Sequence, residues 1–451
     1  MTTLAISLND AAITAVTGSR LVYQEPGFAL LRDGDLVTGG RATAEARRHP
    51  RSVVNHFWRH LGVEPVQELK FRHLTPADLA SRQLEEIWRS ERSADGVVFA
   101  VPAWMERESL GVLLGIAGEL ELPVTALVDS AVACSRRAYP GRSLLHIDLS
   151  LHTASISRIA QEDGAATDRV ELVDAAGLTA LRDTWVAVIA EAFVRQSRFD
   201  PLHTAESEQL LYDRLEPWLE TAQRSGEVRM QLEFGGHGHE AALPLLTFTE
   251  AVSGIYQSLA GHVRSLIRAA EAPALQFTRH TAALPGLVDF LVARAGGEPF
   301  VLEEAAAARG ALARAAAATA GSTRLTRRLP WDQSPVEAPA APVREAGESP
   351  SHLLHGHRAL ALDDEGLAIG TSLGGERGIT LAADMAGVSR RHCVLRRDNG
   401  QCIVEDLSRY GTWLNGSRIE RSAVLQAGDS LRVGTPGQEF RLIRVVESDD
   451  A

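Results

Sequence analysis

Cysteine is scarce in this sequence, which has only Cys134, Cys393 and Cys402 among 451 residues. Their spacing fits no metal-ligand pattern, and an odd, sparse count argues against the disulfide framework of a small secreted domain. We therefore expect no disulfide bonds. We interpret Cys393 and Cys402 as small apolar core residues on neighbouring strands, and the sparse count fits a reducing cytosol.

Long apolar runs are also missing. No window approaches the roughly 18 uncharged apolar residues that a transmembrane helix requires. The N-terminal sequence MTTLAISLND lacks the basic and then apolar regions of a secretory signal. The sequence therefore predicts a soluble, cytoplasmic protein with no membrane insertion.

Basic residues are outnumbered, because 46 lysines and arginines stand against 58 aspartates and glutamates, a formal net charge of −12. A nucleic-acid binder needs a basic face to neutralise phosphates. No block of lysine or arginine dominates this chain. We expect protein partners and no nucleic acid.

Several catalytic motifs are absent. The chain has no GxxxxGK[ST] phosphate loop and no Gly-x-Ser-x-Gly elbow, which removes the motifs of P-loop enzymes and of many hydrolases. His56 and His60 lie four residues apart on an expected helix, but no HExxH arrangement or Cys/Asp cluster accompanies them. We expect no metal site.

The clearest sequence motifs lie near the C-terminus, in residues 388–419. Apolar positions at strand spacing alternate there with turn signals such as Asp398-Asn399-Gly400. The stretch resembles the forkhead-associated (FHA) domain, a phosphothreonine reader, in four ordered motifs: Ser389-Arg390-Arg391-His392, Asp406-Leu407-Ser408, Gly411-Thr412 and Asn415-Gly416. The resemblance implies an all-β FHA sandwich over residues 351–447.

The resemblance also implies a phosphopeptide site. Ser389 would supply a hydroxyl donor and Asn415 a clamp on the peptide backbone, while Arg390 and Arg409 would add positive potential. The sequence departs from the family where Thr371 takes the place of a phosphate-binding arginine. Either another arginine (Arg409, Arg377 or Arg391) substitutes, or the module binds an unphosphorylated partner.

The first 320 residues read as a β-meander, then strand–helix–strand–helix, then a second meander with helices. This order indicates a mixed α/β fold with an internal repeat. It resembles the actin, sugar-kinase and DnaK-type chaperone ATPases, whose fold has two lobes. The matching segments, in common order, are residues 42–50, 61–62, 97–102, 115–118, 246–249 and 308–311.

The nucleotide motifs of that family are degraded here. In the first hairpin, Ser7 stands at the aspartate position and Asn9 at the glycine position. In the second, Asp148 and Thr153 survive but the glycines between them are replaced. Because a Cβ blocks the approach of backbone N–H groups to phosphates, each lost glycine weakens a phosphate site.

Three further positions extend the comparison. The glycines of the adenosine loop are replaced in residues 279–285, the family's glutamate falls on Asp129, and its catalytic lysine falls on Trp58. Asp10 adds negative charge where phosphates would bind. We therefore predict a pseudo-ATPase with no catalytic residue and no cofactor, and we leave weak binding of ATP and Mg²⁺ open.

Residues 322–350 contain five prolines and no apolar periodicity, which indicates an extended, flexible linker. The predicted domains are thus residues 1–321 (DnaK/actin-like), 322–350 (linker) and 351–447 (FHA). The organisation favours a non-catalytic adaptor whose FHA domain binds a protein partner, with the pseudo-ATPase domain as a second interaction surface. The alternatives are an active DnaK-like ATPase targeted to clients by its FHA domain, and an actin-like filament protein.

Overall fold

The computed structural model describes residues 2–269, 271–318, 324–332, 349–355, 358–382, 387–398, 401–409, 411–414, 417–419, 421–434 and 438–444. The chain divides into two units, Met1–Pro339 and Ala340–Ala451. In the part of the chain that is described, no helix has the length and apolar character needed to span a membrane.

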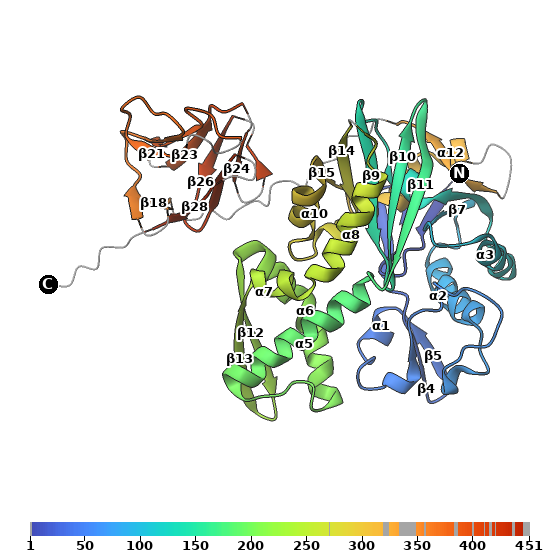
Figure 1. Ribbon diagram of the computed structural model, residues 1–451. Helices are drawn as coiled ribbons and strands as arrows, with labels where there is room; N and C mark the ends of the chain where they lie inside the picture. Colours follow the sequence, from blue (N-terminus) through green and yellow to red (C-terminus); the bar gives the residue numbers. More distant parts are fainter. Residues whose placement is uncertain are drawn as a thin grey trace. The chain divides into compact units, whose positions relative to one another are not determined.

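The first unit contains a six-stranded sheet in the order β16-β8-β7-β1-β2-β3, of which β7 is labelled in Figure 1. The central strands β1 and β7 are parallel, and β7 is buried along its whole length, which fits its unbroken apolar run, Gly-Val-Val-Phe-Ala-Val. The strands are β1 (Thr3–Ser7), β2 (Ile13–Thr17), β3 (Arg20–Glu25), β7 (Gly96–Val101), β8 (Val124–Asp129) and β16 (Leu325–Thr326).

A second six-stranded sheet repeats this pattern in the order β15-β14-β9-β10-β11-β17. In both sheets an antiparallel meander (β1-β2-β3 or β9-β10-β11) continues through its first strand into two parallel strands (β7-β8 or β14-β15). The internal repeat that the sequence indicated is thus visible in the strand order. The strands are β9 (Arg142–Leu149), β10 (Thr153–Gln161), β11 (Gly164–Asp174), β14 (Ala272–Phe277), β15 (Glu298–Val301) and β17 (Arg328–Pro330).

Helices cover the two sheets and bury their apolar faces against them. The start of α2 is set by a capping box, in which Thr75 and Asp78 each accept a hydrogen bond from the backbone N–H of the other, with Pro76 at the first helical position. Phe99 and Leu113 lie in the core of the first sheet. The helices are α2 (Pro76–Ser90), α3 (Arg107–Glu119), α4 (Ser130–Cys134), α8 (Ser253–Leu266), α9 (Arg279–Ala282), α10 (Leu287–Ala295), α11 (Ala306–Ala313) and α12 (Ala315–Ala318).

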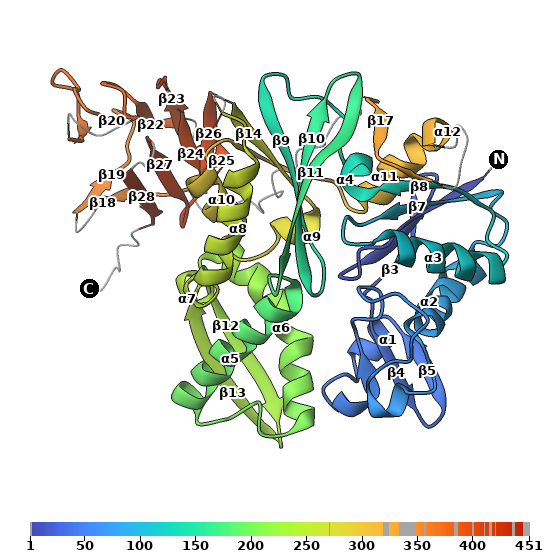
Figure 2. The same cartoon turned by 45° about the vertical axis from the view of Figure 1, so that its right-hand side comes forward.

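Two smaller groups of elements lie away from the large sheets, as Figures 1 and 2 show. One group holds a three-stranded sheet, and the other packs a β-hairpin on long helices. The first comprises β4 (Ala29–Arg32), β5 (Asp35–Thr38), α1 (Gly40–Thr43), β6 (Val53–Val54) and the short 3₁₀ helices Pro50–Ser52 and Leu69–Phe71. The second comprises α5 (Leu178–Ser197), α6 (Ala205–Ser225), β12 (Glu227–Phe234), β13 (His237–Pro244) and α7 (Leu245–Ala251).

One prediction here was wrong. His56 and His60 do not share a helix, because the chain from residue 44 to residue 75 is made of turns, two 3₁₀ helices and the short strand β6. His60 instead closes a turn, with its backbone N–H donating to the carbonyl of His56.

The predicted linker starts later than expected, because residues 324–332 belong to the first unit. We call this segment the strap. It adds β16 to the edge of the first sheet beside β8 and β17 to the edge of the second sheet beside β11. Leu329 of the strap is fully buried. These residues of the predicted flexible linker are extended, but they are paired as strands with both sheets.

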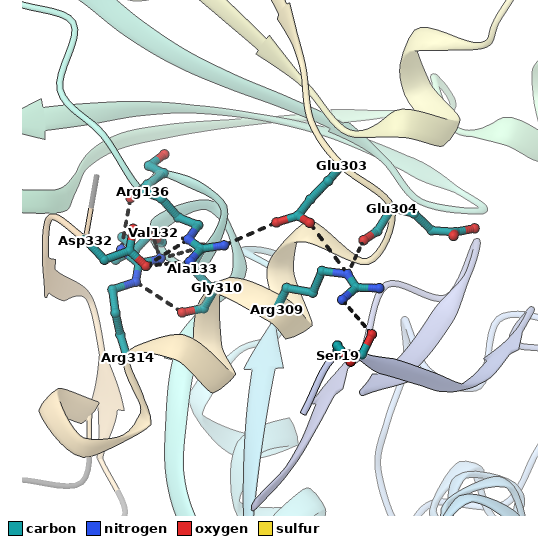
Figure 3. A network of polar contacts seen from close by, with 11 residues as sticks. Ser19, Val132, Ala133, Arg136, Glu303, Glu304, Arg309, Gly310, Arg314 and Asp332 are labelled. Carbon is teal, nitrogen blue, oxygen red and sulfur yellow. Dashed lines mark hydrogen bonds and ion pairs between the residues drawn. The ribbon is translucent and has the colours of Figure 1, made fainter. Parts of the chain in front are cut away.

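The C-terminal end of the strap is held by a network of hydrogen bonds and ion pairs, which Figure 3 shows. Arg136 pairs with Asp332 at 2.7 Å and with Glu303 at 3.2 Å. Arg314 is buried, and its guanidinium donates to carbonyl oxygens that include those of Ser135 and Pro330. Burial lowers the pKa of Arg314 to about 10.

The second unit is a β-sandwich of two sheets, in the orders β19-β18-β28-β27-β24-β25 and β21-β20-β22-β23-β26. Every strand pair except β20–β21 is antiparallel. The strands are β18 (His352–His355), β19 (Arg358–Ala361), β20 (Leu367–Gly370), β21 (Gly378–Thr380), β22 (Cys393–Asp398), β23 (Gln401–Asp406), β24 (Thr412–Leu414), β25 (Ser417–Arg418), β26 (Ser422–Leu425), β27 (Ser430–Val433) and β28 (Gln438–Ile443).

The cysteines are buried and unpaired. Cys393 and Cys402 lie in the core of the sandwich, and Cys134 lies at the end of α4 in the first unit. The expectation that Cys393 and Cys402 are core residues without a disulfide bond is confirmed.

Candidate functional site

Three loops meet at one end of the sandwich and bring together four of the residues predicted to bind a phosphopeptide. The backbone N–H of Thr371 donates to the carbonyl of Ser389 at 3.2 Å, and the N–H of Ser372 donates to the carbonyl of Arg390 at 2.9 Å. The backbone N–H of Arg409 donates to the hydroxyl oxygen of Ser389 at 3.2 Å. Asn415, the predicted backbone clamp, lies outside the described residues.

Gly370 permits the close approach of two of these loops. A Cβ at this position would lie 2.2 Å from the carbonyl oxygen of Arg390, closer than any side chain tolerates. The backbone of Arg390 is therefore pressed against β20, and its carbonyl is held there by Ser372.

His392 joins two of these loops through hydrogen bonds. It is fully buried, its Nδ1 accepts a hydrogen bond from the N–H of Ser389 at 3.1 Å, and its Nε2 donates to the carbonyl of Gly411 at 2.9 Å. Burial lowers the pKa of His392, which favours the neutral ring that these two bonds require. His392 is thus a structural residue that positions Ser389.

The loop from Asp406 to Thr412 is shaped by side-chain hydrogen bonds. One carboxylate oxygen of Asp406 accepts from the N–H of Ser408 at 3.0 Å and from the hydroxyl of Thr412 at 2.8 Å. The hydroxyl oxygen of Ser408 accepts from the N–H of Gly411 at 2.7 Å. These bonds fix the backbone that presents Arg409.

The arginines around the loops differ in their partners. Arg377 is paired with Asp363, and Arg391 is paired with Glu376 at 2.9 Å. The exposed side chains of Arg390 and Arg409 make no hydrogen bond or ion pair within the described ranges of the chain. Of the three arginines considered as substitutes for the missing one, Arg409 is the one whose guanidinium has no partner among the described residues.

Asp148, one of the residues predicted in the degraded nucleotide site, is bonded on both carboxylate oxygens. The side-chain amide of Asn9 donates to Asp148 at 2.8 Å and to the carbonyl of Leu149 at 3.1 Å. Thr278 donates to the other oxygen of Asp148 at 2.7 Å, and His280 lies 3.1 Å from it. Burial opposes ionisation of Asp148, but the hydrogen bonds and charges around it, led by those of His280, together lower the pKa of this carboxyl.

Asp10 forms a second bridge between the two hairpins. One of its carboxylate oxygens accepts from the N–H of Leu151 at 2.7 Å, while the other is buried and has no partner among the described residues. Burial, reinforced by the nearby charge of Asp148, raises the pKa of Asp10 to about 7. A group in this position is therefore partly protonated at neutral pH.

Ser7 and Thr153 occupy the ends of the two hairpins. Ser7 is buried in β1. The hydroxyl of Thr153 donates to Asp174 at 3.2 Å and accepts from Arg59 at 3.3 Å. Thr153 is thus committed to side chains of the protein.

Asp129 and Trp58 have structural partners as well. Asp129 accepts from the N–H groups of Ala131 at 2.9 Å and Val132 at 3.2 Å, and so caps α4. Burial raises the pKa of Asp129. Trp58 is fully buried and donates its indole N–H to Gln83 at 2.8 Å, so no cation stands at this position.

The contacts of Asn9 and Asp10 were missed from the sequence. Asn9 was interpreted only as a lost glycine, and Asp10 only as an added charge. Their partners lie about 140 residues away along the chain, at Asp148 and Leu151. No local signal predicts such a contact.

Metal binding finds no support in the part of the chain that the structure describes, where no group of three or more His, Cys, Asp or Glu side chains is placed to hold an ion. His56 pairs with Glu68 at 3.1 Å, and its ring centroid lies 5.8 Å from that of His60.

Comparison with known proteins identifies the second unit. A model of the FHA domain family matches residues 369–434, a range that includes Thr371, Ser389, Arg390 and Arg409. Residues 369–434 are thus an FHA domain, which implies phosphorylated protein partners. No curated protein matches the chain, and no family model matches the first unit.

Proposed function

We propose that this chain is a non-catalytic cytoplasmic adaptor whose FHA domain binds protein partners phosphorylated on threonine. The observation that carries the proposal is the arrangement around Ser389. The N–H of Arg409 donates to the Ser389 hydroxyl oxygen at 3.2 Å, and this leaves the hydroxyl hydrogen to be donated outward. A phosphate oxygen is the acceptor that such a hydroxyl would serve.

Arg409 supplies the cation that Thr371 lacks. A dianionic phosphate requires charge-assisted donors, and an arginine offers a planar pair of N–H groups that matches two phosphate oxygens. Arg409 is anchored through its backbone at the Ser389 hydroxyl, and its guanidinium is not used by any described residue. Arg377 and Arg391 are less suited, because each would first have to leave a carboxylate.

Fluorescence polarisation with the full-length protein tests this function. A phosphothreonine peptide and its unphosphorylated twin would be titrated against the parent and against Ser389→Ala and Arg409→Ala. Arg396→Ala on β22 serves as the control. We expect the phosphopeptide to bind more tightly and each loop variant to lose about tenfold or more in affinity. Equal affinity for both peptides would remove the claim.

For the first unit we propose a two-lobed, actin-like ATPase fold that has lost hydrolysis. The repeated strand order of its two large sheets supports this fold. In the ATPases that this region resembles, two hairpins hold the nucleotide phosphates with backbone N–H groups. Here side chains of the two hairpins bond directly to each other, through Asn9 to Asp148 and through Asp10 to Leu151.

The chemistry at these hairpins disfavours a nucleotide. Asp148 would have to give up Asn9, Thr278 and His280 before it could hold a magnesium ion or its waters. The N–H of Leu151 would have to leave Asp10 before it could bind a phosphate. The first unit then serves as a second protein-binding surface.

Isothermal titration calorimetry with ATP and Mg²⁺, combined with a phosphate-release assay, tests the loss of activity. We expect neither binding in the micromolar range nor turnover. Micromolar binding with turnover would instead support the rival function, an active chaperone-like ATPase that its FHA domain targets to clients.

A further inference from the structure

Three histidines gather where the loop of residues 44–75 meets the turn between β9 and β10 in the first unit. The ring centroid of His56 lies 5.8 Å from that of His60 and 6.0 Å from that of His152. The Nε2 atom of His152 also lies 3.1 Å from the carbonyl oxygen of Asn55. The histidine cluster of His56, His60 and His152 therefore joins a loop that follows the first meander to a turn within the second.

The charged side chains around the histidine cluster come from several elements. Glu68, on the same loop, lies 3.1 Å from a ring nitrogen of the cluster. Arg59, between two of the histidines, lies 3.6 Å from Asp174 at the end of β11 and donates to the hydroxyl of Thr153 at 3.3 Å. The side chain of Asp174 is 78% exposed, so water screens its charge. The positive charge of Arg59 also acts on Asp10, which follows β1.

The contact between loop and turn disfavours protonation of the cluster. Partial desolvation lowers the pKa of His60 and of His152, and the charges of His56 and Arg59 lower both further. A histidine that leaves this contact regains its ordinary pKa of about 6.5. Because the separated rings then bind protons more readily than the clustered rings, a fall in pH through this value favours separation.

We infer that the histidine cluster is an acid-sensitive contact: acidification protonates His56, His60 and His152 and separates the loop from the β9–β10 turn, which opens the first unit between its two meanders. Positive rings at these distances repel one another, and Arg59 adds to the repulsion. The inference concerns the first unit alone and does not depend on phosphothreonine binding by the second.

Asp10 works against this opening and has to be removed from the test. Its carboxylate accepts a hydrogen bond from the N–H of Leu151, which is adjacent to His152. Since the pKa of Asp10 is raised to about 7, protonation at acid pH stabilises the folded state. Asp10→Asn keeps an oxygen that can accept from Leu151 and removes the titration.

Hydrogen exchange followed by mass spectrometry tests the inference with the full-length Asp10→Asn protein. Exchange is measured at pH 7.5 and pH 5.5, and each rate is divided by that of the denatured chain at the same pH. We expect residues 55–60 and 150–153 to exchange about threefold to tenfold faster at pH 5.5, because local opening exposes their amides. The β12–β13 hairpin should exchange equally at both values.

Glutamine variants separate the cluster from a general effect of acid. In the Asp10→Asn background, His152→Gln keeps an N–H that can donate to the carbonyl of Asn55 but takes up no proton. His60→Gln changes the most exposed of the three residues. Each should remove part of the acceleration, and the double variant should remove most of it. His237→Gln, an exposed histidine on β13, is the matched control and should keep the full acceleration.

Two results would overturn the inference. One is equal protection of residues 55–60 and 150–153 at the two pH values in Asp10→Asn, and the other is full acceleration in the double variant. Circular dichroism at pH 7.5 checks that each variant is folded. If the double variant does not fold, His60→Gln decides, and the inference fails if this variant keeps the full acceleration.

Discussion

The side-chain amide of Asn9 donates a hydrogen bond of 2.8 Å to the carboxylate of Asp148, and so joins the first meander of the first unit to the second. Both residues are buried. Under the ATPase-like fold that we propose for the first unit, this bond lies where a nucleotide would otherwise bridge the two hairpins. The two meanders are therefore held together by the protein's own side chains.

Replacing Asn9 with alanine should destabilise the first unit by about 1–3 kcal/mol, because the buried carboxylate of Asp148 and the carbonyl of Leu149 each lose a donor. Urea unfolding of the full-length protein, followed by tryptophan fluorescence, measures this cost. Gln231→Ala, which removes an exposed amide on β12, should change stability by less than about 0.5 kcal/mol. Equal stability of the two variants would contradict the role of Asn9.

Asp10 should make stability fall as the pH rises toward neutrality. The pKa of Asp10 is about 7 in the folded protein against 3.8 for an ordinary aspartate. Between these values the folded state keeps a proton that the unfolded chain has released, so the stabilisation is full below pH 3.8 and lost as the pH approaches 7. Asp10→Asn removes this titration and should gain about 2 kcal/mol on the parent between pH 5.5 and pH 8.

The matched control for Asp10 is Asp168→Asn. The hydrogen bond from Arg158 lowers the pKa of Asp168, so this group titrates below the pH range of the experiment. Its replacement should change stability by the same amount at pH 5.5 and pH 8. A constant difference between Asp10→Asn and the parent would show that Asp10 does not titrate near neutrality.

Leu329 should anchor the strap to the first unit. Because its side chain is fully buried, Leu329→Ala should cost about 2–5 kcal/mol in urea unfolding. Leu246, which is 62% exposed, offers a control whose replacement by alanine should be nearly neutral. If residues 324–332 are instead a solvated linker, the two variants will be indistinguishable.

Restoring the missing arginine should strengthen phosphopeptide binding. Thr371 lies beside Ser389, to whose carbonyl its backbone N–H donates. Thr371→Arg would add a charge-assisted bond to the phosphate, worth about tenfold in affinity. Fluorescence polarisation should show this gain for the phosphorylated peptide only; a gain for both peptides would point to general electrostatic attraction.

The thiols should be inert in the native protein. Burial raises the pKa of Cys393 to about 12 and that of Cys402 to about 11, and it also raises that of Cys134. Since the thiolate is the reactive form, a thiol reagent at pH 8 should label the native chain slowly and all three cysteines once it is denatured. Rapid labelling of the native chain would show that these cores open readily.

The sequence predicted the second unit better than the first for a physical reason. The FHA motifs lie within about 70 residues, and their turns and strands are local, so Ser389, Arg390 and Arg409 could be placed in neighbouring loops. The bridges of Asn9 and Asp10 depend on contacts across about 140 residues. Reading each hairpin alone shows that Asn9 and Asp10 are polar, but not that they bond to the other hairpin.

The strap shows a different limit of sequence reasoning. Its prolines and its lack of apolar periodicity indicated a flexible linker, whereas two leucines of the segment make its contacts with the first unit. Leu325 packs against the core of the first sheet and Leu329 is buried beside the second. The average composition of residues 322–350 therefore did not predict that two of its leucines pack against the first unit.

The strap also determines how the first unit resists a pull on the chain that follows it. Within the described residues, the C-terminal end of the strap is held by the ion pair between Asp332 and Arg136 and by the bond from Arg314 to the carbonyl of Pro330. The buried side chain of Leu329 adds to this hold, so a pull on the strap would have to overcome all three contacts. Because β16 and β17 belong to different sheets, such a force is shared between both halves of the first unit.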